Sequence, residues 1–149
     1  MLERPAVEAT ELRQVMDDLR IVIEADWEEA DGSIQWPEGV MPRVLADAHG
    51  LLRVFLNLSK NSLRAVSEAN SKTLHIGVTI CDGKACIQFA DSGPGVNTPD
   101  RLFRPFDQMS EGSGLGLYIS RTMLRTYGGD LRYEPTDRGA SFVVELQVV

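Results

Sequence analysis

The stretch Gly112-Ser113-Gly114-Leu115-Gly116-Leu117 says most about the fold of this 149-residue sequence, because a glycine run leads directly into an apolar helical pattern. Glycine lets the backbone approach a ligand closely, and free N–H groups at a helix start favour a bound anion. The stretch therefore predicts a phosphate-binding loop followed by a helix over residues 117–127. A flexible loop that only caps the helix is the alternative interpretation.

A second signal comes earlier, at the end of a predicted strand, in the stretch Asp91-Ser92-Gly93-Pro94-Gly95. A carboxylate can accept a hydrogen bond from an exocyclic amine of a base, and Gly93 and Gly95 leave room for a flat ring. Asp91 is thus a candidate for base recognition. A simple turn built around Asp91 is the alternative.

A third signal lies on a helix predicted over residues 50–69, with Asp47 as its N-cap. Asn57, Asn61 and Arg64 follow one another at steps of four and three, so they share one face of this helix. A neutral amide oxygen can ligate Mg²⁺, and an arginine can bind a phosphate oxygen. An amphipathic helix with a polar outer face is the alternative.

The rest of the chain alternates between helical and strand periodicity. The expected elements are a helix over 9–29, short strands over 33–36 and 43–46, a hairpin over 72–80 and 85–90, and closing strands over 130–134 and 141–148. Helices mixed with antiparallel strands in this order predict an α+β fold, a two-layer α/β sandwich. On the last helix, the side chains expected in the core are Tyr118, Ile119, Met123 and Leu124.

Together the three motifs resemble the N box, G1 box and G2 box of histidine-kinase catalytic domains, within the wider group that includes gyrase, Hsp90 and MutL. Between the last two motifs, Leu102-Phe103-Arg104-Pro105-Phe106 resembles the F box. The resemblance covers residues 43–149, in the family's order and approximate spacing. It implies the Bergerat-type ATP-binding fold, in which helices pack on one face of a mixed, mostly antiparallel sheet.

The resemblance also implies a role for each matching position. Asn61 would ligate Mg²⁺, and Asn57 would support the metal or the phosphates from the same helix face. Asp91 would accept from the adenine amine, while Phe103 and Phe106 would anchor the loop over the phosphates. The other expected nucleotide-site residues are Gly93, Gly95, Lys60, Arg64, Gly112, Ser113, Gly114, Leu115 and Gly116.

The identity of residue 57 distinguishes between two possible activities, phosphoryl transfer to histidine and ATP hydrolysis. In hydrolytic relatives and related serine kinases, a glutamate at this position acts as general base, and an amide cannot take a proton. An imidazole nitrogen attacks with its own lone pair, so positioning and charge neutralisation suffice. The sequence therefore predicts a histidine kinase domain that uses Mg-ATP. A hydrolytic ATPase and a non-catalytic nucleotide sensor are the alternatives.

The phosphate acceptor is expected outside this chain, because the two histidines, His49 and His75, lie at a helix start and within a strand. Residues 1–30 are interpreted either as the tail of a histidine-bearing dimerisation domain or as the first helix of the ATP-binding domain, which spans 31–149. The implied partners are ATP or ADP, that helical-hairpin domain in cis or in trans, and indirectly a response regulator.

The net charge of −7 does not favour nucleic acid or anionic lipid. The residues after Met1 are charged, so we expect no secretory leader there, and no apolar run approaches the roughly 18 residues of a membrane span. We therefore expect a cytoplasmic domain without direct membrane contact, whose parent protein can still be membrane-anchored. Cys81 and Cys86 flank a predicted turn, where they could face each other across two strands, and are expected to be reduced.

Overall fold

The computed structural model describes residues 7–96, 99–104, 116–136 and 139–149. Its elements in chain order are β1 (Glu8–Glu11), α1 (Leu12–Glu29), β2 (Ser33–Gln35), β3 (Arg43–Ala46), α2 (Ala48–Val66), β4 (Thr73–Cys81), β5 (Lys84–Asp91), the 3₁₀ turn η1 (Pro99–Arg101), α3 (Gly116–Thr126), β6 (Asp130–Pro135) and β7 (Ala140–Gln147). The predicted α+β sandwich is confirmed.

The main sheet has five strands in the order β2-β4-β5-β7-β6, and β1 and β3 form a separate antiparallel pair. The main sheet is mixed, because β2 runs parallel to β4 while the other neighbours are antiparallel. Asp82 and Gly83 make the β4–β5 turn with φ angles of 53° and 75°, as expected for an Asp-Gly hairpin. A bridge between Val44 and Val148 links the small sheet to the end of β7.

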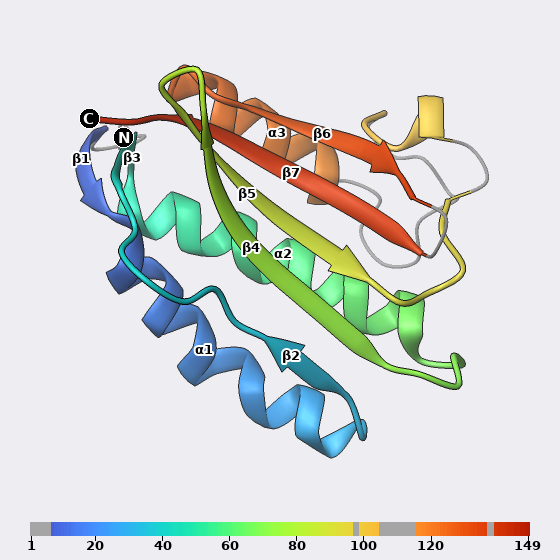
Figure 1. The fold of residues 1–149 in the computed structure, drawn as a ribbon. Coiled ribbons are helices and arrows are strands. Elements are labelled where there is room, and N and C mark those ends of the chain that lie inside the picture. The colour runs from blue at the N-terminus through green and yellow to red at the C-terminus, as the bar shows by residue number, and fades with distance from the viewer. Residues whose placement is uncertain (1–6, 97–98, 105–115, 137–138) are drawn as a thin grey trace, which may run out of the picture.

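The three helices lie on one face of the main sheet (Figure 1), with α2 between α1 and α3. Asp47 begins α2 as predicted, since its carboxylate accepts a hydrogen bond from the Gly50 amide at 2.9 Å. The apolar side of α2 is fully buried at Leu51, Phe55 and Leu58. In the described part of the chain, no helix has the length and apolar character needed to cross a bilayer.

Helix α1 is part of the same core as α2 and the sheet. Its buried face consists of Leu12, Val15, Met16, Leu19, Ile23 and Trp27. Trp27 is 1% exposed, and its indole N–H donates to the Ser59 hydroxyl of α2 at 3.2 Å. Val22 has the same helical spacing in the sequence as these apolar residues, but it is 51% exposed.

The prediction that the first helix begins at Ala9 is wrong, because residues 8–11 form β1 and the helix begins at Leu12. Pairing with β3 overrides the helical pattern, and the Thr10 hydroxyl donates to the Ala46 carbonyl at 2.7 Å. The prediction that Cys81 and Cys86 could face each other across the two strands is also wrong. The two-residue turn pairs Cys81 with Lys84 and Cys86 with Thr79, and both thiols are free.

The predicted core of α3 is partly wrong. Leu124 is buried, but Tyr118 and Ile119 are 42% and 46% exposed. The inward face of this helix instead follows Leu117, Ser120, Leu124 and, just past its end, Tyr127. These positions are separated by three, four and three residues, which keeps them on one helix face and turns residues 118 and 119 outward.

We predict that Trp27→Ala destabilises the fold by about 3–5 kcal/mol, because it removes a fully buried indole and leaves a cavity between α1 and α2. Denaturant unfolding followed by circular dichroism measures this loss. The matched control on the same helix is Ile21→Ala, where a side chain that is 79% exposed should change stability by less than about 0.5 kcal/mol. Equal stabilities of the two variants would mean that α1 is not an integral part of the core.

Candidate functional site

Three segments that are far apart in sequence meet on one side of α2. The Ser62 hydroxyl donates to the Asp91 carboxylate, which lies at the end of β5. Gly93 packs against the carbonyl of Ala65. Nearer the start of α2, the side chain of Asn57 packs against Gly116, the first residue of α3. We call the part of α2 from Asn57 to Ala65 the strip; at about 1.5 Å per helical residue it is about 12 Å long.

Asp91 is a buried carboxylate, with 6% of its surface exposed. Its Oδ1 accepts hydrogen bonds from the amides of Gly93 at 2.9 Å and Ala140 at 3.3 Å. Burial raises the pKa of this carboxyl, and the two amides and the Ser62 hydroxyl only partly oppose that shift. Both backbone donors use one oxygen, so the carboxylate keeps acceptor capacity for a further donor such as an amine.

A side chain at Gly93 would clash with the backbone of α2, and one at Gly116 would displace the Asn57 side chain. A Cβ on Gly93 would lie 2.8 Å from the Ala65 carbonyl oxygen, and a Cβ on Gly116 would lie 2.5 Å from Asn57 Oδ1. Gly95 has a φ of +85°, a backbone conformation that glycine adopts without strain. Gly93 and Gly95 were predicted to leave room for a flat ring, and Gly116 to bring backbone close to a ligand. The structure places Gly93 and Gly116 against α2.

Asn57 joins α2 to α3. Its Nδ2 donates to the hydroxyl of Ser120 at 3.2 Å, and Ser120 is itself only 4% exposed. With its amide engaged in this way and Gly116 packed against it, Asn57 fixes the start of α3 relative to α2. A neutral amide in this place has no basic lone pair that could remove a proton.

Asn61 lies one turn after Asn57 and is half-buried. Its Oδ1 accepts from Nη2 of Arg64 at 2.5 Å, so the predicted metal-ligand oxygen and the predicted phosphate-binding arginine lie side by side. Lys60 is exposed on the neighbouring surface of the helix. In the described residues, no group of three or more histidine, cysteine, aspartate or glutamate side chains is placed to hold a metal ion.

Phe103 is half-buried, and its ring lies under the guanidinium of Arg121 from α3, with Cζ 4.8 Å from the ring centroid. The predicted residues Phe106, Gly112, Ser113, Gly114 and Leu115 lie outside the described residues. Among the described residues, the candidate site comprises Asn57, Asn61 and Arg64 on α2, Asp91 at the end of β5 with Gly93 and Gly95 after it, Phe103 after η1, and Gly116 on α3.

Sequence reasoning missed three residues at this site: Ser62, Ser120 and Arg121. Ser62 stands next to Asn61 and Ser120 stands four residues after Gly116, but nothing in their spacing singles them out. Arg121 looks like any surface arginine on an amphipathic helix. The packing of α2 against β5 and α3 reveals Ser62 and Ser120, and the contacts with Phe103 and Asp130 reveal Arg121.

A shallow hollow of about 450 Å³ lies elsewhere, at the β2–β4 edge of the sheet. It is lined by Gln35 to Glu38 and His75 to Val78, and it includes none of the predicted site residues. The convergence on α2 is the better guide to function, because it combines a buried carboxylate with two glycines at close-packed positions.

The chain belongs to the family described as histidine kinase-, DNA gyrase B-, and HSP90-like ATPase, whose model matches residues 46–149. The C4-dicarboxylate transport sensor protein DctB of Rhizobium meliloti (strain 1021) is 32% identical over 114 residues, which are 74% of this chain and 18% of DctB. Sporulation kinase D of Bacillus subtilis (strain 168) is 34% identical over 100 residues, 64% of this chain and 19% of that kinase. The chain thus spans less than a fifth of the length of these two relatives.

Solved structures share the fold. The catalytic domain of the histidine kinase ThkA matches with a TM-score of 0.85 and 22% identity, over 95% of each chain. Full-length ShkA in complex with AMPPNP matches with a TM-score of 0.84 and 22% identity, over 100% of this chain and 33% of ShkA. The fold of this chain is therefore that of a histidine kinase catalytic domain.

We predict that Asp91→Asn weakens Mg-ATP binding by about 1.5–3 kcal/mol, as measured by isothermal titration calorimetry. The asparagine oxygen can keep the bonds from Gly93 and Ala140, but its NH₂ group then turns a donor toward the amine that the carboxylate would have accepted. Wild-type affinity in this variant would remove Asp91 from the base-binding position.

The same substitution should not weaken the fold. The pKa of Asp91 in the folded protein is raised above its ordinary value of 3.8. The protonated carboxyl therefore makes its full contribution to the free energy of unfolding below pH 3.8, and this contribution is lost as the pH rises through the folded pKa. At neutral pH the buried charge therefore costs stability, which the neutral asparagine avoids. Unfolding curves should show Asp91→Asn at least as stable as wild type at pH 7, with its advantage shrinking toward pH 4.

Proposed function

We propose that this chain is the ATP-binding catalytic domain of a sensor histidine kinase, which transfers the γ-phosphate of Mg-ATP to a histidine on a separate helical domain. The observation that carries the proposal is the meeting of Asp91, Gly93 and Gly116 on one strip of α2. Family membership supports it, as do the names of the relatives, a sensor protein and a sporulation kinase. The response regulator seen with ThkA supports an indirect partner of that class for the parent protein.

The Asp91 end of the strip is proposed to bind the adenine base. The carboxylate accepts from the exocyclic amine, and its specificity is strong because leaving a buried charge without its donor is costly. Gly93 and Gly95 let the backbone beside the carboxylate pack closely, because a Cβ would lie 2.8 Å from the Ala65 carbonyl oxygen at Gly93 and 3.2 Å from the Gly139 carbonyl oxygen at Gly95. A guanine would present a carbonyl oxygen where adenine presents its amine, and two acceptors would then face each other.

The Gly116 end is proposed to face the phosphates, with residues 112–115 supplying further amides. The start of an eleven-residue helix offers free N–H groups and a favourable dipole. Asn61 would hold Mg²⁺ through Oδ1, which requires Arg64 to turn away from that oxygen toward a phosphate. Bound Mg²⁺ would neutralise charge on the transferring phosphate.

Transfer to histidine fits this site better than hydrolysis, because Asn57 offers no base and its amide is already bonded to Ser120. The acceptor would approach near the start of α3, where Tyr118 and Ile119 expose apolar surface beside Gly116. Neither His49 nor His75 is proposed as acceptor. We propose that residues 1–30 contribute the first elements of the domain, because α1 shares its core, and that the domain works in the cytoplasm, where ATP is supplied.

The direct test mixes the 149-residue chain with Mg²⁺, γ-labelled ATP and a histidine-bearing helical-hairpin fragment from a matched kinase. We expect acid-labile, base-stable label on the fragment, and none when its histidine is replaced by alanine. Steady phosphate release without label on the fragment would favour the hydrolytic ATPase. Nucleotide binding without either reaction would favour a nucleotide sensor.

We predict that Asn61→Ala leaves the fold intact but abolishes the Mg²⁺ dependence of nucleotide binding, because the proposed ligand oxygen is lost while the half-buried position tolerates a smaller side chain. Calorimetric titrations of ATP with and without Mg²⁺ measure this. Asn70→Ala is the matched control, since it removes the same amide from an exposed position beyond α2. If Asn61→Ala still binds ATP more tightly with Mg²⁺, then another residue is the ligand.

A further inference from the structure

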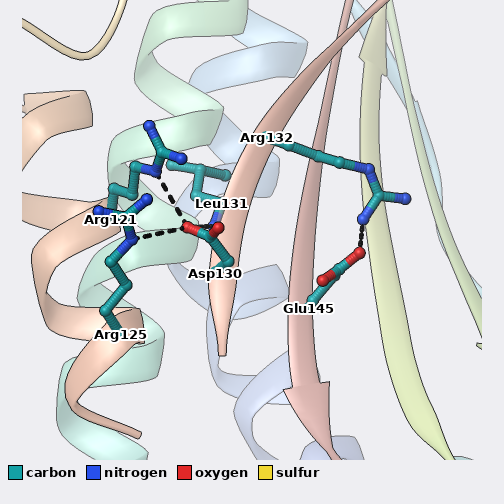
Figure 2. Close-up of polar contacts among 6 residues, drawn as sticks. All are labelled: Arg121, Arg125, Asp130, Leu131, Arg132 and Glu145. Atoms are coloured by element: carbon teal, nitrogen blue, oxygen red, sulfur yellow. Dashed lines mark hydrogen bonds and ion pairs between the residues drawn. The ribbon is translucent and has the colours of Figure 1, made fainter. Parts of the chain in front are cut away.

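Arg121 of α3 is held between two groups from other parts of the chain. On one side its Nε lies 3.0 Å from Oδ1 of Asp130, at the start of β6, as Figure 2 shows. On the other side its guanidinium lies over the ring of Phe103, with Cζ 4.8 Å from the centroid. Cation–π attraction acts within about 6 Å of the ring centroid, so this contact is well inside its range.

Asp130 holds Arg121 firmly in place. Its Oδ1 accepts three hydrogen bonds, from Arg121 Nε, from Arg125 Nε at 3.2 Å and from the Leu131 amide at 2.8 Å. Burial disfavours the charged carboxylate, but these hydrogen bonds outweigh burial and keep the pKa of Asp130 below its ordinary value. The carboxylate is therefore ionised at neutral pH, and its backbone bond fixes its position.

Phe103 is the other end of this chain of contacts. It lies two residues after the end of η1, and its half-buried ring packs against the hydrophobic core. The backbone around it is a series of tight turns, with Leu102 N bonded to Pro99 O at 3.3 Å and Arg104 N to Arg101 O at 3.2 Å. Holding the ring of Phe103 therefore holds this short segment against α3.

Arg125 provides an internal comparison. It lies one turn after Arg121 and binds the same carboxylate oxygen, with its side chain 56% exposed against 32% for Arg121. Among the described residues, the cation over the Phe103 ring is Arg121. The two arginines thus share the link to β6 but differ in the link to Phe103.

We infer that Arg121 is a positioning residue for nucleotide binding, which acts by fixing Phe103 and its segment against the helix that begins at Gly116. The inference rests on the proposed function, because Gly116 meets Asn57 at the phosphate end of the strip on α2. Asp130 orients Arg121, Arg121 orients Phe103, and the segment after η1 is thereby set relative to α2 and α3.

The test compares Arg121→Met with Arg125→Met in the full 149-residue chain, using titration calorimetry with Mg-ATP. Arg121→Met should weaken binding by roughly 2- to 30-fold, the range expected from loss of one cation–π contact. Arg125→Met should change it by less than about 2-fold, as expected for an exposed ion pair whose partner keeps other donors. Arg121→Lys, which retains a cation above the ring, should recover most of the affinity. Equal losses in Arg121→Met and Arg125→Met would overturn the inference.

A double-mutant cycle separates positioning through Phe103 from a general structural role. In a Phe103→Leu background, which removes the aromatic ring, Arg121→Met should produce no further loss of affinity. If the full loss persists in that background, Arg121 does not act through Phe103 and the inference is wrong.

Amide hydrogen exchange tests the contact between Arg121 and Phe103 in the absence of nucleotide. Arg121→Met should speed exchange of the Leu102 and Arg104 amides, and Arg125→Met should not. Failure of wild-type chain to bind Mg-ATP would sink the proposed function, whereas unchanged exchange at these two amides in Arg121→Met would sink the positioning role alone.

Discussion

The packing of α2 is the constraint on which the rest of this structure depends. One side of the helix fills the core through Leu51, Phe55 and Leu58, and another side receives backbone from the β5 end and from the start of α3. Interiors are close-packed, so neither side can shift without disturbing the other. The Ala65 carbonyl leaves no room for a Cβ on Gly93, and a Cβ on Gly116 would displace the Asn57 side chain. The rigid core of the domain therefore also sets the geometry of the proposed nucleotide site.

Asp91 shows what this arrangement costs. A buried carboxylate with a raised pKa opposes folding at neutral pH. A neutral side chain could accept the same hydrogen bonds without burying a charge. Such a group is expected where recognition of a ligand requires it. Here its two backbone partners come from different segments, Gly93 after β5 and Ala140 at the start of β7, so the carboxylate is also fixed between two strands.

The sequence predicted the elements with strong local signals, such as the Asp47 cap, the Asp-Gly hairpin and the order of helices and strands. It failed where tertiary contacts decide. β1 looks helical until it pairs with β3, and the outward rotation of Tyr118 and Ile119 depends on how α3 sits on α2. The motifs lead to a proposal of which residues face a nucleotide, whereas supporting residues such as Ser62, Ser120 and Arg121 become visible only when the segments are brought together.

Asn57 connects the architecture to the proposed chemistry. Its amide donates to Ser120, and its side chain occupies the space that Gly116 leaves, so it serves as a link between α2 and α3. A general base in this place would need a carboxylate turned toward an attacking water, and would give up the donor that Ser120 accepts. A nucleophile that brings its own lone pair makes no such demand. On the proposed function, the chain therefore supplies binding and geometry while the partner supplies the reactive nitrogen, and selectivity for that partner falls to the surface around the start of α3.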